Sequence, residues 1–141
     1  MPVEIKYLDD ERGVLFIGEG IVTGEDIFNS NKHFFSSEEK MIKNIYSIID
    51  YSNITKFEVS NADLGTIISQ NKKVSESLAG GTVAVVAKED LIFGISRMWG
   101  TYVEIADLPW EINVLRARRD AEAWIKDRVK EKFRIDDLTF D

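Results

Sequence analysis

Hydrophobic residues recur along the chain with two spacings. Alternating or continuous short apolar runs predict strands, and apolar residues three and four positions apart behind a capping residue predict helices. The predicted strands cover residues 3–7, 14–17, 46–51, 82–87 and 111–115. The predicted helices begin near Gly24, after Ser60, at Asp90 and near Asp120, and Ser36 with Glu39 predicts a shorter helical piece.

The order of these elements predicts an α/β fold. The polar turn over residues 8–13 joins the first two strands as a hairpin, and strands then alternate with helices. This order indicates a mixed five-stranded sheet, mostly parallel after its first strand, with about four helices. We expect a bend or bulge at 18–20, the third strand to end at 52–53, and Gly80 and Gly81 to stop the helix behind Ser60.

The segment from Leu91 to Trp110 holds more large apolar residues than one helix face needs. We expect one stripe to enter the core, made of Leu91, Ile95, Met98, Tyr102 and Ile105. Other aromatic residues then face elsewhere, with Arg97 beside them. A second apolar face indicates a protein interface or an apolar ligand cleft, with plain core packing as the alternative. The residues of this candidate site are Phe93, Arg97, Trp99, Tyr102 and Trp110.

Gly94 lies inside this predicted helix. Glycine there costs about 1 kcal/mol relative to alanine, so the close approach of another backbone would account for it.

The last predicted helix carries acidic residues in its first turn and basic residues near its end, an arrangement that the helix dipole favours. We interpret residues 1–134 as one domain and 135–141 as an acidic, frayed tail, and we expect the acidic clusters 9–11 and 136–137 to be solvated.

Composition and charge disfavour several classes of function. The 141 residues hold 18 Lys and Arg against 25 Asp and Glu, a formal charge of −7, which disfavours nucleic-acid partners. No cysteine is present, so there is no thiolate nucleophile or disulfide. No apolar run reaches the ~18 residues of a membrane span, and the first 20 residues lack a signal-peptide pattern. We therefore expect a cytoplasmic protein.

No motif for catalysis or cofactor binding is present. His33 is the only histidine, and the sequence contains no Gly-x-Ser-x-Gly motif whose serine it could activate as a base. The acidic clusters lack the residue spacing of a calcium-binding loop. Glycines 18, 20 and 24 miss the dinucleotide fingerprint by one position. We expect a non-enzymatic protein with no cofactor and no metal.

Three stretches carry a resemblance to a known group. They are residues 48–52 with 60–64, residues 83–87 with 93–99, and residues 113–115 with 120–125. Together they resemble the small bacterial SpoIIAA-like proteins of the STAS/Sec14-type group, over roughly residues 3 to 130. The resemblance implies a SpoIIAA-like fold, whereas most members of the group have no assigned activity.

Ser60 has two readings. Anti-sigma-factor antagonists of the STAS type are phosphorylated on a serine of an Asp-Ser-Ser-Gly motif, and the resemblance places Ser60 at that position. Here the stretch is Glu-Val-Ser-Asn, without the preceding Asp-Ser or the following Gly. The other reading is an ordinary N-cap with Asp63, which contributes about 1 kcal/mol.

Two functions follow from these observations. The first is a regulatory protein–protein interaction module that forms a homodimer through the aromatic helix. The alternative, which the Sec14 side of the resemblance implies, is a carrier of a small apolar or lipid-like ligand. In a carrier, the aromatic residues of the candidate site would line the cleft and Arg97 would hold the ligand's head group.

Overall fold

The computed structural model describes residues 2–78 and 81–141 and contains a five-stranded sheet in the order β1-β2-β3-β4-β5. β1 and β2 are antiparallel, and every later pair is parallel, as predicted. The strands are β1 (Val3–Leu8), β2 (Gly13–Thr23), β3 (Tyr46–Glu58), β4 (Thr82–Val86) and β5 (Glu111–Leu115). The helices are α1 (Gly24–Phe35), α2 (Glu38–Lys43), α3 (Asn61–Val74), α4 (Asp90–Ile105) and α5 (Arg118–Phe133).

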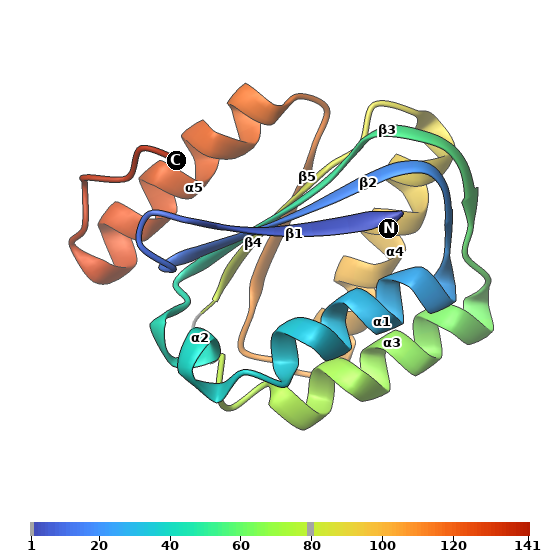
Figure 1. The fold of residues 1–141 in the computed structure, drawn as a ribbon, viewed down its shortest axis with the longest axis horizontal. Helices are drawn as coiled ribbons and strands as arrows, with labels where there is room; N and C mark the ends of the chain where they lie inside the picture. The colour runs from blue at the N-terminus through green and yellow to red at the C-terminus, as the bar shows by residue number, and fades with distance from the viewer. Residues whose placement is uncertain (1, 79–80) are drawn as a thin grey trace.

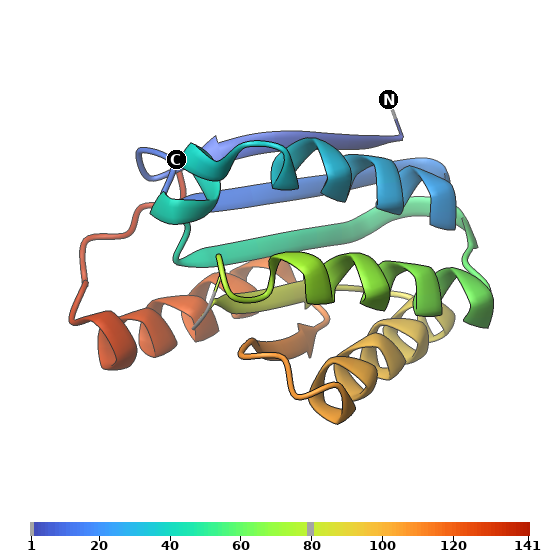
Figure 2. The same ribbon diagram turned by 90° about the horizontal axis from the view of Figure 1, so that it is seen from below.

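The helices cover both faces of the sheet (Figure 1). Alternate residues of the buried strands point to opposite faces, so β4 sends Val85 to one core and Ala84 and Val86 to the other. The first core lies under α1, α3 and α4, which Figure 2 shows side by side, and the second lies under α5. Each core is closed by the apolar side of its helices.

Local capping determines where the helices begin. Thr23 with Asp26 and Ser60 with Asp63 form reciprocal capping boxes at the starts of α1 and α3, as their spacing predicts. The short helix α2 is capped by Ser37 rather than by the predicted Ser36, whose hydroxyl donates to the last turn of α1. α3 ends at Val74, earlier than the predicted stop at Gly80 and Gly81, and Gly80 lies outside the described residues.

β2 and β3 are longer than predicted. The expected loop at residues 52–53 is part of β3, which runs on beside β2 until Thr23 pairs with Glu58. The register shifts between Ile17 and Glu19 and again after Gly20, which has φ +66° and lies in the predicted bulge. Because this extension pairs only β2 with β3, the polar residues along it remain at the surface.

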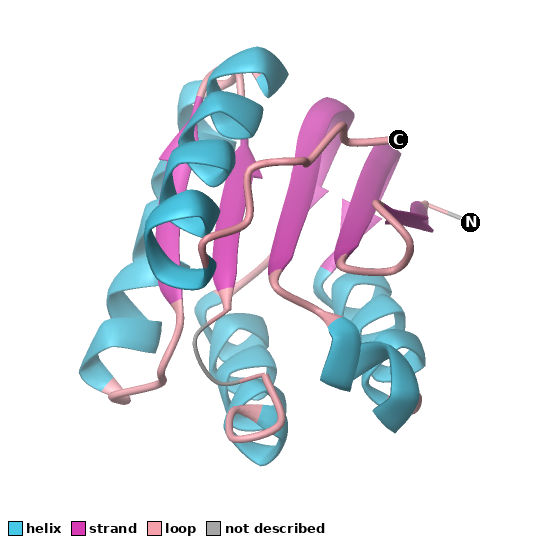
Figure 3. Cartoon of the chain, turned by 90° about the vertical axis from the view of Figure 1, so that its left-hand side faces the viewer, coloured by secondary structure: helices cyan, strands magenta, loops and turns pink. Residues whose placement is uncertain are grey.

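The predicted frayed tail is wrong. Residues after α5 turn back and cross toward the β1–β2 hairpin (Figure 3), and Leu138 is 3% exposed. Phe140 packs edge-on against Tyr46, with ring centroids 5.4 Å apart. The sequence suggested a solvated acidic segment, but the apolar residues within it cover the open end of the second core.

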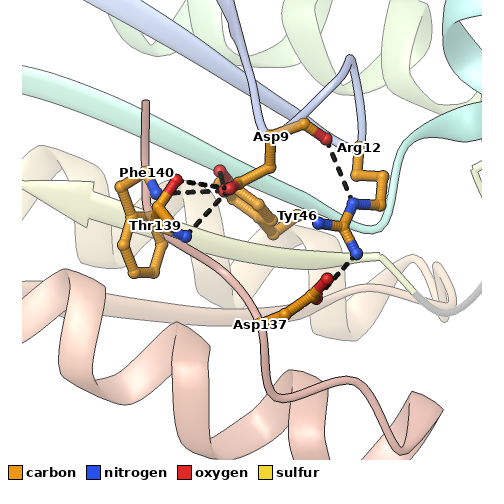
Figure 4. A network of polar contacts seen from close by, with 6 residues as sticks. All are labelled: Asp9, Arg12, Tyr46, Asp137, Thr139 and Phe140. Carbon is orange, nitrogen blue, oxygen red and sulfur yellow. Dashed lines mark hydrogen bonds and ion pairs between the residues drawn. The ribbon is translucent and has the colours of Figure 1, made fainter.

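Asp9 anchors this tail, so the prediction of a fully solvated acidic cluster is also wrong. Its carboxylate accepts hydrogen bonds from the Thr139 amide (2.8 Å) and hydroxyl (3.0 Å), the Phe140 amide (3.1 Å) and the Tyr46 hydroxyl (2.5 Å) (Figure 4). Burial alone would raise the pKa of Asp9, but these donors lower it overall. Asp137 of the second cluster pairs with Arg12 at 2.9 Å.

Candidate functional site

Helix α4 connects β4 to β5 and carries most of the predicted site. Its buried residues are Ile92, Ser96 and Val103. The predicted core stripe is wrong, because Leu91 is 65% and Ile105 is 75% exposed. Two apolar stripes compete on this helix, and the one that contains Ile92 and Val103 packs inward beside Trp99.

The outer face of α4 is therefore apolar. Leu91, Met98, Tyr102 and Ile105 are four of the seven large hydrophobic residues exposed in the described part of the chain. They recur at steps of three, four and seven, so they lie in one stripe along the helix. Gly94 lies beside this stripe, and a methyl group added to it would meet no atom within 4 Å. The backbone contact expected at Gly94 is not made within the chain.

The five predicted site residues do not come together at one place. Phe93 and Arg97 line an open cleft of about 560 Å³ between α4 and β5. Trp99 lines an internal cavity on the other side of the helix, and Trp110 lines both spaces. Tyr102 lies on the outer stripe.

The internal cavity lies between the sheet and α1, α3 and α4. Its volume is about 90 Å³, and its lining is mostly aliphatic and aromatic. Residues from each layer contribute, among them Phe16, Ile49, Ile67, Val85 and Ile95. No charged side chain lines it. It is therefore a mainly nonpolar, partly open space lined by residues of the first core.

Polar groups around this cavity differ in how they are satisfied. The Asn71 side chain accepts a hydrogen bond from Trp99 Nε1 (3.0 Å), and the Ser30 hydroxyl donates to the Ile27 carbonyl (2.9 Å). The Ser96 hydroxyl and the Trp110 indole N–H are buried, and neither has a hydrogen-bond partner among the described residues. A buried unpaired donor costs about 1–3 kcal/mol, so these two groups lower the stability of the fold beside α4.

The cleft beside β5 is more polar, and the charged residues that line it are Arg97, Glu104 and Asp107. The Arg116 guanidinium lies 3.9 Å from the centre of the Phe93 ring and pairs with Asp90 at 2.9 Å. Arg97 also lies near this ring, at 6.0 Å.

Ser60 is exposed and acts as the N-cap of α3. Its hydroxyl accepts from the Asp63 amide at 3.1 Å, and the Asp63 carboxylate accepts from the Ser60 amide at 2.9 Å. Phosphorylation of Ser60 stays a prediction.

Groups that would support other chemistry are sparse in residues 2–78 and 81–141. This part of the chain contains no cluster of three or more His, Asp or Glu side chains that could hold a metal ion. It also contains no helix that is both long and apolar enough to span a membrane. His33 is exposed in the last turn of α1.

Comparison with solved structures decides the fold. A protein of the DUF3478 family from Shewanella loihica PV-4, uncharacterised and described as having a SpoIIAA-like fold, matches with a TM-score of 0.57. The match covers 87% of this chain and 91% of that protein, at 19% sequence identity. The chain has the SpoIIAA-like fold. No protein-family model and no curated protein matches the sequence.

This SpoIIAA-like domain has a cavity and an exposed apolar stripe on two sides of one helix. Sequence reasoning singled out α4 but not Ser96 or Asn71. A serine within an apolar helix was the available signal for Ser96. Asn71 gave no signal, since its importance comes only from its contact with Trp99.

Proposed function

We propose that this protein is a non-enzymatic interaction module that self-associates through the outer face of α4. The observation that carries the proposal is the exposed stripe of Leu91, Met98, Tyr102 and Ile105. Exposed apolar residues gathered on one helix face favour a partner over water. The chemistry of this face points to a second copy of the chain.

The argument for a second copy is the symmetry of the stripe. In an antiparallel pair with its two-fold axis at Met98, Leu91 of one copy lies opposite Ile105 of the other. Gly94 then lies opposite Tyr102, the largest side chain of the stripe. The open space above Gly94 accommodates this ring, which accounts for a glycine in the helix interior. Such a self-complementary patch is what a two-fold dimer requires.

The test is the oligomeric state measured by analytical ultracentrifugation. Met98→Glu places two carboxylates at the axis and is expected to convert a dimer to folded monomers. Thr66→Glu on the exposed side of α3 is the matched control and should leave the dimer intact. A wild-type chain that is monomeric at every concentration measured, or a dimer unaffected by Met98→Glu, overturns the proposal.

Gly94→Leu tests the register of this dimer. Leucine has a higher helix propensity than glycine, so the monomer should become more stable. The leucine would also occupy the space assigned to Tyr102 of the second copy, so association should weaken. Stronger association would indicate nonspecific apolar contact instead of the antiparallel arrangement.

A second candidate function is a carrier of a small, mainly apolar ligand. The mainly apolar pocket of about 90 Å³ between the sheet and the helices favours it. Its size selects for a small ligand, because an engineered cavity of about 150 Å³ holds benzene. Native mass spectrometry of gently purified protein separates the two candidates, since a dimer of clean chains supports the first and bound extra mass supports the second.

A further inference from the structure

β5 leaves one edge of the sheet open beside α4. The Glu111 amide donates to the segment before β4 (3.0 Å), and the Leu115 carbonyl accepts from the segment after it (2.9 Å), so both residues direct backbone groups toward β4. Neighbouring residues of a strand direct their backbone groups to opposite sides, so Ile112 and Val114 direct theirs away from β4. Among the described residues, no other strand lies beyond β5 to receive these groups.

The two edges of the sheet differ in the charges that they carry. β1 has the exposed side chains of Glu4 and Lys6, and charged residues on an edge strand discourage pairing with another strand. Glu111 is the only charged residue of β5, and it pairs with Arg128 (2.9 Å) and Lys132 (3.0 Å) of α5. These pairs lie on the face of the sheet opposite to α4. The edge of β5 on the α4 side therefore has no charge of its own that discourages pairing.

The cleft of about 560 Å³ between α4 and β5 runs along this open edge. Its charged lining residues, Arg97, Glu104 and Asp107, are all exposed. The ion pairs of the described chain involve other residues, such as Arg116 with Asp90, and none includes these three. The cleft thus presents one cation and two anions that have no counter-charge within the described residues.

The two anions lie at the C-terminal end of α4. A helix dipole places partial negative charge at this end, and basic residues normally compensate it. α1, α2, α3 and α5 each carry lysine in their last turn, whereas α4 has no basic residue there. Glu104 in the last turn and Asp107 just after it add two carboxylates to an end that already favours cations. A cationic group of a partner would relieve this arrangement.

The shape of the edge favours a single strand over a second copy of the chain. Two β5 strands related by a two-fold axis would pair antiparallel and place both α4 helices on the same face of the joined sheet. The last turns of α4 reach past β5 at this edge (Figure 2), so the two helices would compete for the same space. An extended peptide segment brings no helix, and adding such a strand to an open sheet edge is a recurring mode of recognition.

We propose that an extended segment of a partner protein adds to β5 as an antiparallel strand and places a basic side chain at Glu104 and Asp107. The outward backbone groups of Ile112 and Val114 hold the segment, because an antiparallel pair exchanges two hydrogen bonds at such positions. This interaction goes beyond the self-association proposed above. It uses the side of α4 that faces β5, whereas self-association uses the outer stripe.

The charges of the cleft also fix the direction of the segment. α4 leads into β5, so the C-terminal end of α4 lies beside the start of β5, and an antiparallel segment brings its later residues there. The basic residue is therefore preceded by an acidic residue, which lies near Arg97. A spacing of four fits, since four strand residues span about 13 Å and the helix rises about 10 Å between Arg97 and Glu104.

Two blocked peptides of identical composition test the proposal on the full chain. Thr-Glu-Thr-Val-Thr-Lys-Thr has its acidic residue before its basic one, and Thr-Lys-Thr-Val-Thr-Glu-Thr has the reverse order. An NMR titration measures their affinities, and hydrogen exchange measures the protection of individual backbone amides. We expect the first peptide to bind more tightly and to protect the Ile112 and Val114 amides, while exchange along β1 stays unchanged.

Removing the two anions separates charge recognition from backbone pairing. Glu104→Gln combined with Asp107→Asn should weaken the first peptide about three- to ten-fold and reduce the difference between the two peptides. Asparagine tolerates the positive φ of position 107, so the turn after α4 is kept. Glu38→Gln combined with Glu39→Gln is the matched control, because it removes two charges from exposed positions of α2 and should leave both affinities unchanged.

Every other outcome overturns the proposal. No binding of either peptide at its highest soluble concentration excludes strand addition, and equal affinities or a preference for the reverse order exclude the charge recognition. Binding without protection of Ile112 and Val114 would mean charge attraction alone. Protection of these amides in the peptide-free chain that rises with protein concentration would mean that a second copy covers the edge. Self-association through the outer stripe is decided independently by ultracentrifugation of Met98→Glu.

Discussion

Two sites of buried polar groups, one on each face of the sheet, differ in their hydrogen bonding. Under α5 and the tail, the buried Asp9 carboxylate receives four hydrogen bonds. Under α4, the Ser96 hydroxyl and the Trp110 indole N–H make no hydrogen bond with the described residues. The first arrangement closes the end of the second core, whereas the second leaves two buried donors without a partner.

The comparison shows that several features unfavourable for stability lie on α4. α4 has no side-chain N-cap, it buries a serine, and it exposes large apolar residues such as Leu91 and Ile105. α3 beside it has a capping box, and its buried Asn71 is paired. Violations of folding rules that gather on one element indicate binding, because residues selected for a partner need not suit the isolated chain.

The largest effect on stability is expected at Asp9, whose buried carboxylate accepts hydrogen bonds from the tail. Asp9→Asn replaces one acceptor oxygen with an amide group that faces other donors. Asparagine tolerates the positive φ of this position, so backbone strain does not contribute. The free energy of unfolding should fall by about 2–3 kcal/mol in urea denaturation, with faster hydrogen exchange at Thr139 and Phe140. Asp10→Asn, at the exposed neighbour, should change neither, and equal effects of the two variants would contradict the role of Asp9.

The same contact is expected to depend on pH. The pKa of Asp9 in the folded protein is below its ordinary value near 4, so the carboxylate binds its proton less readily when folded. Its contribution to stability is therefore complete above pH ~4 and is lost as the pH falls through the lower, folded pKa. The protection factor of the Thr139 amide, which corrects for the slower intrinsic exchange in acid, should fall with pH in the wild type and show no such step in Asp9→Asn. A pH-independent tail in the wild type would refute this assignment.

At Ser96, whose buried hydroxyl has no partner among the described residues, we expect a substitution to change stability in the opposite direction. Ser96→Ala removes a buried unpaired hydroxyl and should raise the free energy of unfolding of the ligand-free chain by about 1 kcal/mol, seen as a higher melting temperature. Ser30→Ala makes the same replacement in α1, but it deletes a hydroxyl that has a partner and should lower stability. If both variants shift the melting temperature in the same direction and by the same amount, the contrast between the two serines is lost.

The smallest effect sharpens the comparison between α3 and α4. Ser60→Ala removes the cap of α3 and should lower the free energy of unfolding by about 1 kcal/mol. Ser69→Ala, in the exposed middle of α3, supplies the matched control and should not destabilise the chain. Intact mass of native wild-type protein tests the phosphorylation prediction separately, and the absence of an added phosphate across growth conditions would leave Ser60 as a cap.

Most of the fold could be predicted because the signals for its helices and strands lie in neighbouring residues. The capping boxes at Thr23 and Ser60 and the apolar run of β4 need only neighbouring residues to be recognised. The rotation of α4 could not be predicted, because its two stripes are similarly hydrophobic. The choice between them depends on contacts with distant residues, including the hydrogen bond from Trp99 to Asn71.

The prediction for the C-terminal tail was wrong for the same reason, because the packing of the tail also depends on distant residues. Its acidic residues indicated solvation, and Asp9 resembles its neighbours in the acidic turn. Leu138 and Phe140 alternate with polar residues, and this weak pattern was the available sign of a packed segment. What makes Asp9 special is a contact with Thr139, 130 positions away, which no local window contains.

That separation also affects how the chain is made. Asp9 is synthesised early, but its partners Thr139 and Phe140 follow on the order of ten seconds later at ribosomal rates. During that interval the hairpin carries a carboxylate without its donors, and the end of the second core stays open to chaperones and proteases. A nascent chain that stalls before these residues would therefore be recognised as unfinished.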